Sequence, residues 1–183
     1  MLASIHPLGE RAKHNRWAVT VASYLLGSVT AGALLGAALG TLGLHAGRAA
    51  VAALCVIAAL VDASRRRVPS WRRQVNEDWL RRYRGWVYGI GFGFQLGLGV
   101  VTIVTSAAVY LTFTLAALSG STAAGAVIGA LFGLSRAAPL LLMGGVAGPE
   151  HLRALHARFA GAAPWARRVT VAGLFSAALG SFR

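Results

Sequence analysis

The chain has 183 residues, of which 56% are hydrophobic and 13% are charged, with a mean hydropathy of +0.62 and a net charge of +13. Soluble domains are about 45–50% apolar and about 25% charged, and one cysteine forms no disulfide framework. This composition excludes a disordered tail, a disulfide scaffold and a soluble enzyme. It predicts an all-α, polytopic membrane helix bundle, a single integral membrane domain over residues 1–183.

In chain order, the uncharged stretches predict about five transmembrane helices, because a bilayer crossing needs about 20 apolar residues. The predicted spans are residues 17–44, 47–63, 86–118, 122–147 and 167–182. The first is longer than the apolar region of a signal peptide, about 7–15 residues, so we expect it to be retained as a transmembrane helix.

The basic residues are confined to alternate loops. The N-terminal tail, residues 64–85 and residues 149–168 hold nearly all of them, whereas the other two loops hold only Arg48. The positive-inside rule therefore predicts the N-terminus inside and the C-terminus outside, in a bacterial cytoplasmic membrane. Because these basic clusters separate apolar spans and form no folded basic domain, we expect no nucleic-acid partner.

The Arg-rich cytoplasmic segment 64–85 carries aromatic and apolar residues at intervals of four, with arginines on the other side. These residues are Trp71, Val75, Trp79 and Tyr83, preceded by Pro69, which can begin a helix. The pattern predicts an interfacial amphipathic helix between the second and third spans. It serves either as a positive-inside anchor or as a docking surface for a cytoplasmic partner protein.

Glycines repeat every four residues in several spans. The predicted helix-packing positions are Gly32, Gly36 and Gly40 in the first span and Gly125, Gly129 and Gly133 in the fourth. Small residues at this spacing let membrane helices approach closely. The ridges pack either within one chain or, in the alternative, as the seam of a homodimer.

Polar residues of the third span fall on one side of a continuous helix. The residues in question are Gln95, Thr102, Thr105, Ser106 and Tyr110. Such side chains either satisfy hydrogen bonds within and between helices or line a substrate path.

Arg136 lies near the middle of the fourth span, three residues before Pro139. A central arginine costs about 2.5–3.5 kcal/mol on insertion scales, so it requires a partner. Asp62, at the cytoplasmic end of the second span, is one candidate for a structural ion pair. The alternative is that Arg136 attracts an anion on a transport path.

Other reactive side chains are sparse. His6, Glu10 and His14 step by four, but a proline and a glycine between them disfavour the helix that a metal site there would need. Cys55 stands alone in an apolar stretch and is expected to be a packed core residue. We therefore expect no enzyme, no catalytic residue, no metal site and no cofactor.

The third and fourth spans resemble a known family. They are similar to the second half of the DsbD/CcdA transmembrane reductant transporters, in the LysE-type transporter group. The similarity is carried by Gly91-Phe-Gly-Phe-Gln-Leu-Gly-Leu-Gly99, Leu118-Ser-Gly-Ser-Thr122, residues 125–133 and Ala138-Pro-Leu-Leu-Leu-Met143. The resemblance implies a scaffold of repeated helix units. The chain departs from the family where Val101-Thr102-Ile103 replaces its Thr-Pro-Cys, so the resemblance does not extend to thiol exchange.

Two functions follow as hypotheses. The first is a transporter-like permease for a small, possibly anionic solute, using the Gln95–Ser106 face together with Arg136 and Asp62. The second is a non-transporting membrane anchor or assembly subunit for a partner protein. A water-filled core would favour the permease, whereas a dry, fully packed core with an exposed apolar ridge would favour the anchor.

Overall fold

The computed structural model describes residues 5, 7–64, 68–69, 78–99, 104–146 and 148–180. Within these ranges the regular structure is helical, which agrees with the all-α prediction. The helices are α1 (Pro7–Ala12), α2 (Trp17–Gly40), α3 (Arg48–Ala63), α4 (Trp79–Arg82), α5 (Gly85–Gly97), α6 (Ala108–Leu118), α7 (Thr122–Ala137), the 3₁₀ helix η1 (Ala138–Gly145) and α8 (Pro149–Gly180).

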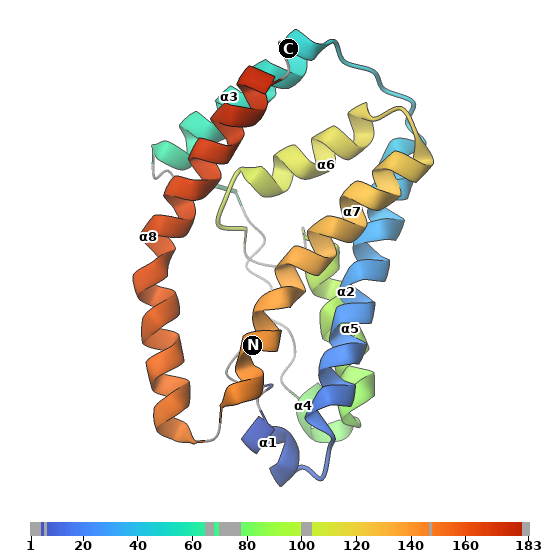
Figure 1. Ribbon diagram of the computed structural model, residues 1–183. Helices are drawn as coiled ribbons and strands as arrows, with labels where there is room; N and C mark the ends of the chain where they lie inside the picture. The colour runs from blue at the N-terminus through green and yellow to red at the C-terminus, as the bar shows by residue number, and fades with distance from the viewer. Residues whose placement is uncertain are drawn as a thin grey trace.

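Helix α2 packs against α7, and the two backbones touch (Figure 1). A Cβ atom added at Gly32 would lie 2.1 Å from the carbonyl oxygen of Gly129, and one at Gly36 would lie 2.1 Å from that of Gly125. The Ser28 hydroxyl donates a hydrogen bond of 2.8 Å to the carbonyl oxygen of Gly133. The predicted packing glycines of the first and fourth spans thus lie at an interface within this chain.

Helix α5 packs against α2 in the same manner. A Cβ atom added at Gly93 would lie 2.0 Å from the carbonyl oxygen of Tyr24, and one at Gly97 would lie 2.1 Å from that of Ser28. Any larger side chain at these positions would push the helices apart. The α2–α5–α7 unit is therefore joined by backbone contact.

A second layer is formed by α3, α6 and α8. The buried residues Ala52, Cys55 and Ala58 of α3 cluster with Leu111 of α6 and Ala178 of α8. Figure 1 shows α3 and the C-terminal half of α8 side by side, with α6 between them and the α2–α5–α7 unit. Cys55 is packed in this cluster.

The N-terminal helix α1 is fixed to the bundle by a buried carboxylate. Glu10 has no exposed surface and accepts hydrogen bonds from the Thr20 hydroxyl, at 2.8 Å, and from the Tyr88 hydroxyl. The Asn15 side chain also donates to the Tyr88 oxygen, and the Lys13 ammonium lies 5.5 Å from the centre of the Tyr88 ring. Buried charges require such partners, so α1, α2 and α5 are held together at this end.

Two helical stretches are long and apolar enough to cross a bilayer, Trp17–Gly40 and Thr122–Gly145, each of 24 residues. They correspond to the predicted first and fourth spans. The second stretch changes from α to 3₁₀ geometry at Ala138, because Pro139 supplies no backbone N–H to continue the α-helical pattern.

The predicted third span, residues 86–118, is not one helix. Helix α5 ends at Gly97, Gly99 adopts a positive φ of 69°, and α6 begins only at Ala108. Glycine tolerates this left-handed conformation, which a continuing α-helix cannot contain. The prediction that Gln95 and Ser106 share one helical face is therefore wrong.

The polar segment 149–168 is not a loop either. It forms the first half of α8, a 32-residue helix that continues through Pro164 into the predicted fifth span. Leu152, Leu155 and Phe159 pack against the core beside η1, which explains why this polar sequence is helical.

The predicted amphipathic helix of the Arg-rich segment lies largely outside the described residues, Trp71 and Val75 included. Its described part is the four-residue α4. Trp79 stacks on Phe92 of α5, with ring centroids 6.2 Å apart, so its ring packs on the bundle, whereas Tyr83 is 49% exposed.

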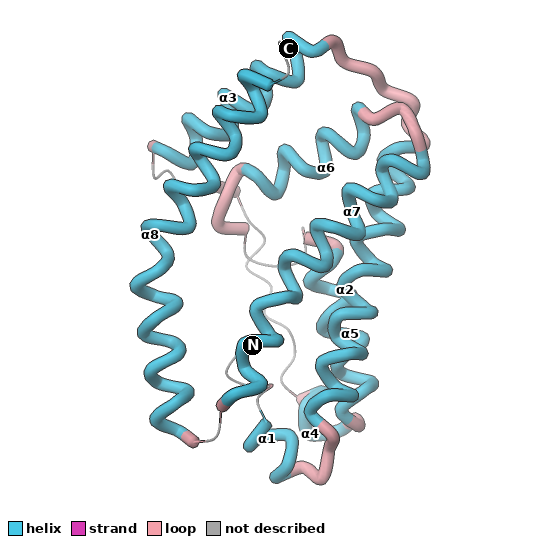
Figure 2. The backbone as a smooth tube through the Cα atoms, viewed as in Figure 1, coloured by secondary structure: helices cyan, strands magenta, loops and turns pink. Residues whose placement is uncertain are grey.

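Several of the described connections lie at the two ends of the molecule, whereas the segment before α6 lies in its middle (Figure 2). The segment 41–47 and the turn 119–121 lie together at one end, where His45 and Ser119 form an isolated backbone bridge. The turn after α1, helix α4 and the start of α8 lie at the other end.

Candidate functional site

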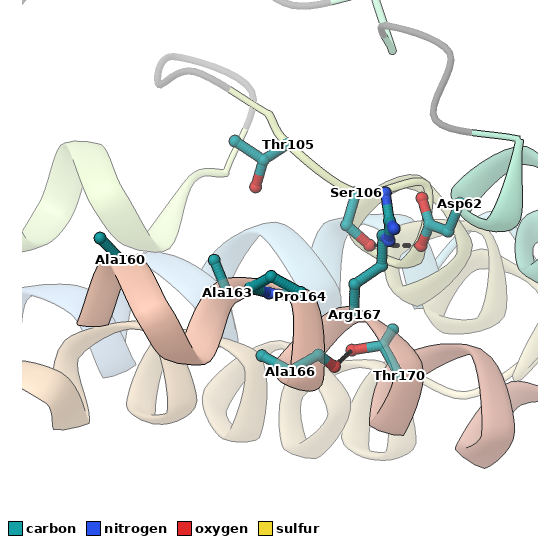
Figure 3. A pocket seen from close by; sticks show the side chains of 9 residues that line it. All are labelled: Asp62, Thr105, Ser106, Ala160, Ala163, Pro164, Ala166, Arg167 and Thr170. Carbon is teal, nitrogen blue, oxygen red and sulfur yellow. Dashed lines mark hydrogen bonds between the residues drawn. The ribbon is translucent and has the colours of Figure 1, made fainter. Parts of the chain in front are cut away.

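A cavity of about 700 Å³ lies between the end of α3, the segment before α6 and the middle of α8 (Figure 3). It is lined by Asp62, Thr105, Ser106, Ala160, Ala163, Pro164, Ala166, Arg167 and Thr170. We call it the α3–α6–α8 cavity. Small-molecule sites in proteins have volumes of about 300–1,000 Å³, so it is large enough to hold a ligand.

Asp62 fixes the α3 side of this cavity to the start of α6. Its side chain is 6% exposed and accepts hydrogen bonds from the Ser106 hydroxyl, at 2.6 Å, and from the backbone N–H of Ala107, at 2.7 Å. The Ser106 oxygen in turn accepts from the N–H of Ala108, at 3.1 Å. The carboxylate thus caps the N-terminus of α6 from a different helix, where the helix dipole also favours a negative charge.

The α8 side of the cavity offers acceptor oxygens and one cation. Pro164 has no backbone N–H and so gives no helical hydrogen bond to the carbonyl of Ala160. The Thr170 hydroxyl donates to the carbonyl of Ala166, at 3.0 Å. Arg167 extends from α8 toward the Ser106 and Asp62 side of the cavity in Figure 3.

A second cavity, of about 340 Å³, lies between α6 and α7. Its lining includes Thr105, Thr112, Phe132, Ser135 and Arg136. The Arg136 guanidinium lies 5.5 Å from the centre of the Phe132 ring, a cation–π contact. The Thr112 and Ser135 hydroxyls both donate to carbonyls of their own helices.

The structure brings only some of the predicted site residues together. Asp62, Thr105 and Ser106 share the α3–α6–α8 cavity, and Thr105 also lines the second cavity beside Arg136. Asp62 and Arg136, the predicted ion pair, line different cavities. Two further predicted residues line neither cavity: Gln95 is half-buried on α5, and the Tyr110 hydroxyl donates to the carbonyl of Pro69. Thr102 falls outside the described residues.

The sequence interpretation missed the α8 wall of the larger cavity. Residues 149–168 were expected to form a loop, so Pro164, Arg167 and Thr170 had no predicted place near Asp62. The sequence did contain one signal for this proximity. Asp62 and Arg167 lie at the cytoplasmic ends of two predicted spans, residues 47–63 and 167–182, so the prediction places both at the same depth in the membrane.

The α3–α6–α8 cavity contains one acidic and one basic side chain, Asp62 and Arg167. Within the described ranges, histidine, cysteine and acidic side chains form no group of three that could hold a metal ion. A buried carboxylate and a guanidinium in one cavity can hold groups of opposite charge.

This chain is similar to curated proteins with one shared name. It is 34% identical over 151 residues to the methylamine utilization protein MauF of Paracoccus versutus, an alignment that covers 76% of this chain and 55% of that relative. It is 36% identical over 72 residues to MauF of Methylophilus methylotrophus, covering 39% of this chain and 25% of the relative. No protein-family model and no solved structure matches the chain. The chain thus spans about half the length of the first of these relatives and a quarter of the second.

These similarities correct two predictions. The resemblance to the DsbD/CcdA reductant transporters is wrong, because the curated relatives are named as MauF proteins and not as members of that group. The transporter-like permease is wrong for the same reason, since neither relative is named as a transporter. The runs of glycine and apolar residues that suggested the resemblance are those that close helix packing requires.

Proposed function

We propose that this chain is a bacterial integral membrane protein that supports methylamine utilization as a non-transporting anchor or assembly subunit for a partner protein. The observation that carries the proposal is the 34% identity over 151 residues to the P. versutus relative. From the relatives' name the proposal takes only the process, methylamine utilization. The role as an anchor or assembly subunit is the second hypothesis of the sequence analysis.

The packing of the bundle supports this role. Helices α5 and α7 meet α2 through backbone contacts at several successive glycines. Both cavities described above lie beside α6; the larger one is lined by no residue of that unit, whereas the smaller one has α7 as one wall. Large apolar side chains are exposed on the outer faces, such as Leu26 and Leu34 of α2, 60% and 63% exposed, and Leu131 of α7, 61% exposed. This combination of a packed unit and exposed apolar ridges suits a membrane-embedded anchor.

For the arrangement in the bilayer we propose the five-span topology, with the N-terminus in the cytoplasm. Helix α1, helix α4 and the start of α8, which belong to segments rich in basic residues, lie at one end of the structure, and the segment 41–47 and the turn 119–121, which carry no basic residue except His45, lie at the other. Helix α8, about 48 Å long at 1.5 Å per residue, is long enough to run between the two ends, and its basic first half begins at the end that holds α1 and α4. The partner protein then meets the basic cytoplasmic end, where Tyr83 is exposed.

Deletion of the gene, followed by assays on intact and permeabilised cells, tests the function. We expect the deletion strain to lose growth on methylamine and to keep growth on an unrelated carbon source. Methylamine oxidation should remain absent after permeabilisation, because the defect lies in assembly of the oxidising system. Recovery of oxidation on permeabilisation would show a transport defect and overturn the proposal. Unimpaired growth on methylamine would overturn the link to this process.

A further inference from the structure

Exposed cations from two distant segments meet at the end of the molecule that holds α1 and α4 (Figure 1). The first segment is α1 with the turn that follows it, and the second runs from α4 to the start of α5. We call their exposed basic residues the basic platform: Arg11, Lys13, Arg16, Arg82 and Arg84. Within the described residues of these segments, 7–16 and 78–85, the one exposed acidic residue is Asp78, so the platform is strongly positive.

Contacts between the two segments hold the platform together. A Cβ atom added at Gly85 would lie 3.1 Å from the side chain of Asn15. The Asn15 side chain in turn donates a hydrogen bond of 3.3 Å to the hydroxyl oxygen of Tyr88. Because Arg16 follows Asn15 and Arg84 precedes Gly85, these two arginines flank the contact, and cations of both segments share one surface.

The α1 part of the platform has a fixed position. Glu10 has no exposed surface, and its carboxylate accepts hydrogen bonds from the Thr20 and Tyr88 hydroxyls, whereas Arg11 and Lys13 beside it are exposed. Burying a carboxylate costs free energy, and a positive-inside signal depends only on the number of basic residues in a loop. The fixed arrangement indicates that the positions of the cations matter as well as their number.

Two exposed aromatic side chains border the platform. Tyr83 is 49% exposed and Trp86 is 50% exposed, and in the sequence they lie on either side of Arg84. Protein–protein interfaces are enriched in tyrosine, tryptophan and arginine, which also carry much of the binding energy. A guanidinium pairs with a carboxylate through two parallel hydrogen bonds. This composition suits the docking of an acidic protein surface.

We propose that the basic platform binds an acidic surface of the partner protein, with its arginines paired to Asp and Glu side chains. This inference rests on the proposed function and topology, and it deepens them by giving the chemistry of the partner. The other anionic surface near this end is that of the membrane lipids, which attract basic residues without requiring a fixed arrangement. The fixed placement of α1 at the end of the bundle favours the protein (Figure 1).

The test is photo-cross-linking in intact cells grown with methylamine. A photoreactive phenylalanine analogue replaces Tyr83 in the full chain, and mass spectrometry identifies the cross-linked molecule and the cross-linked region. We expect a protein whose cross-linked region carries more Asp and Glu than Lys and Arg. Cross-linking to phospholipid alone, to a protein region without net negative charge, or to no molecule would overturn the proposal.

Charge-reversal variants test whether the platform carries the interaction. Arg11→Glu and Arg82→Glu, one from each segment, should each reduce the cross-linked yield by about fivefold or more, as loss of charged pairs predicts. Arg158→Glu is the matched control, because Arg158 is exposed on α8 and lies outside the platform; its yield should match that of the parent. Yields are compared at equal amounts of chain in the membrane. Equal losses in all three variants would overturn the assignment to the platform.

A charge-conserving variant separates the protein partner from lipid. Arg82→Lys combined with Arg84→Lys keeps both charges but loses the planar guanidinium geometry, so the yield should fall by about threefold or more. An unchanged yield would show that charge alone is recognised, as at a lipid surface, and would overturn the arginine–carboxylate pairing.

Growth separates the failure of this inference from that of the proposed function. If the deletion strain loses growth on methylamine but Arg11→Glu restores it as fully as the parent chain does, this inference is refuted and the accessory role stands. Normal growth of the deletion strain itself would refute the proposed function.

Discussion

The carboxylate of Asp62, next to the last residue of α3, accepts a hydrogen bond of 2.7 Å from the backbone N–H of Ala107, immediately before α6. The two residues are 45 positions apart in the sequence, yet the Asp62 side chain caps the N-terminus of α6, which begins directly after Ala107. Nearly all of the Asp62 surface is buried, so the bond is shielded from water. This contact links the second layer of the bundle and shapes the α3–α6–α8 cavity.

Asp62→Ala should destabilise the protein by about 1–3 kcal/mol, because it leaves the Ser106 hydroxyl and the Ala107 N–H without their acceptor. Asp62→Asn should cost less, since the amide keeps one acceptor oxygen. Thermal unfolding in detergent measures the difference. Glu150→Ala, an exposed acidic residue in the first turn of α8, is the control and should have a smaller effect. Equal effects of Asp62→Ala and Glu150→Ala would contradict the capping role.

Gly129→Ala should destabilise the α2–α7 interface by about 1–3 kcal/mol or more, the usual cost of overpacking. A Cβ atom there would lie 1.9 Å from the carbonyl oxygen of Gly32, and a backbone atom has little freedom to move aside. Gly173→Ala on α8 is the matched control, with no atom within 4 Å of its added Cβ. The control should be neutral or stabilising, because alanine favours helix over glycine by about 0.5–1 kcal/mol. Equal melting temperatures for the two variants would refute this interface.

A double-mutant cycle tests the Asp62–Arg136 ion pair that the sequence suggested. In the structure Asp62 is bound to Ser106 and Ala107, whereas Arg136 lies over Phe132 in the other cavity. We therefore expect Asp62→Asn and Arg136→Gln to be additive in unfolding free energy within about 0.5 kcal/mol. If the double variant is more stable than Arg136→Gln alone, the two charges are coupled as a pair.

Tyr88→Phe should loosen the N-terminal helix. The Tyr88 hydroxyl donates to the fully buried Glu10 carboxylate, and its loss leaves that charge with fewer donors, at a cost of about 1–3 kcal/mol. Limited proteolysis should cleave the α1 region faster in this variant. Tyr110→Phe is the control, because the Tyr110 hydroxyl donates to the carbonyl of Pro69 and contacts no buried charge. Unchanged cleavage in Tyr88→Phe would show that other contacts hold α1.

The five-span topology predicts opposite labelling at the two loop ends. In a Cys55→Ser background, Leu42→Cys should react with an impermeant thiol reagent added outside intact cells, and His151→Cys should react only after the cells are opened. Leu42 is 57% exposed in the segment between α2 and α3, so burial does not protect it. External labelling of His151→Cys would overturn the topology. The background change should itself preserve any growth phenotype, since Cys55 is a packed core residue.

The sequence alone determined the class of this protein. A chain with long uncharged stretches must bury its backbone polar groups in helices, so composition was sufficient to predict an all-helical bundle. The glycines at intervals of four also predicted close helix packing from the sequence, because two helices approach closely only where small residues line one face of each. The first and fourth predicted spans accordingly correspond to the two long apolar helical stretches of the structure.

The tertiary structure alone decided where the helices end and which side chains meet. Gly99 lies in an apolar run with nothing in the local pattern to distinguish it from Gly97, yet it takes the positive φ that ends the helix, close to the rings of Phe113 and Phe132. Residues 149–168 read as a polar loop, yet the first half of α8 is helical because Leu152, Leu155 and Phe159 find an apolar surface beside η1. Helicity of such a segment depends on a partner distant in the sequence. The same long-range packing brings Arg167 into the cavity with Asp62, a juxtaposition that no local spacing encodes.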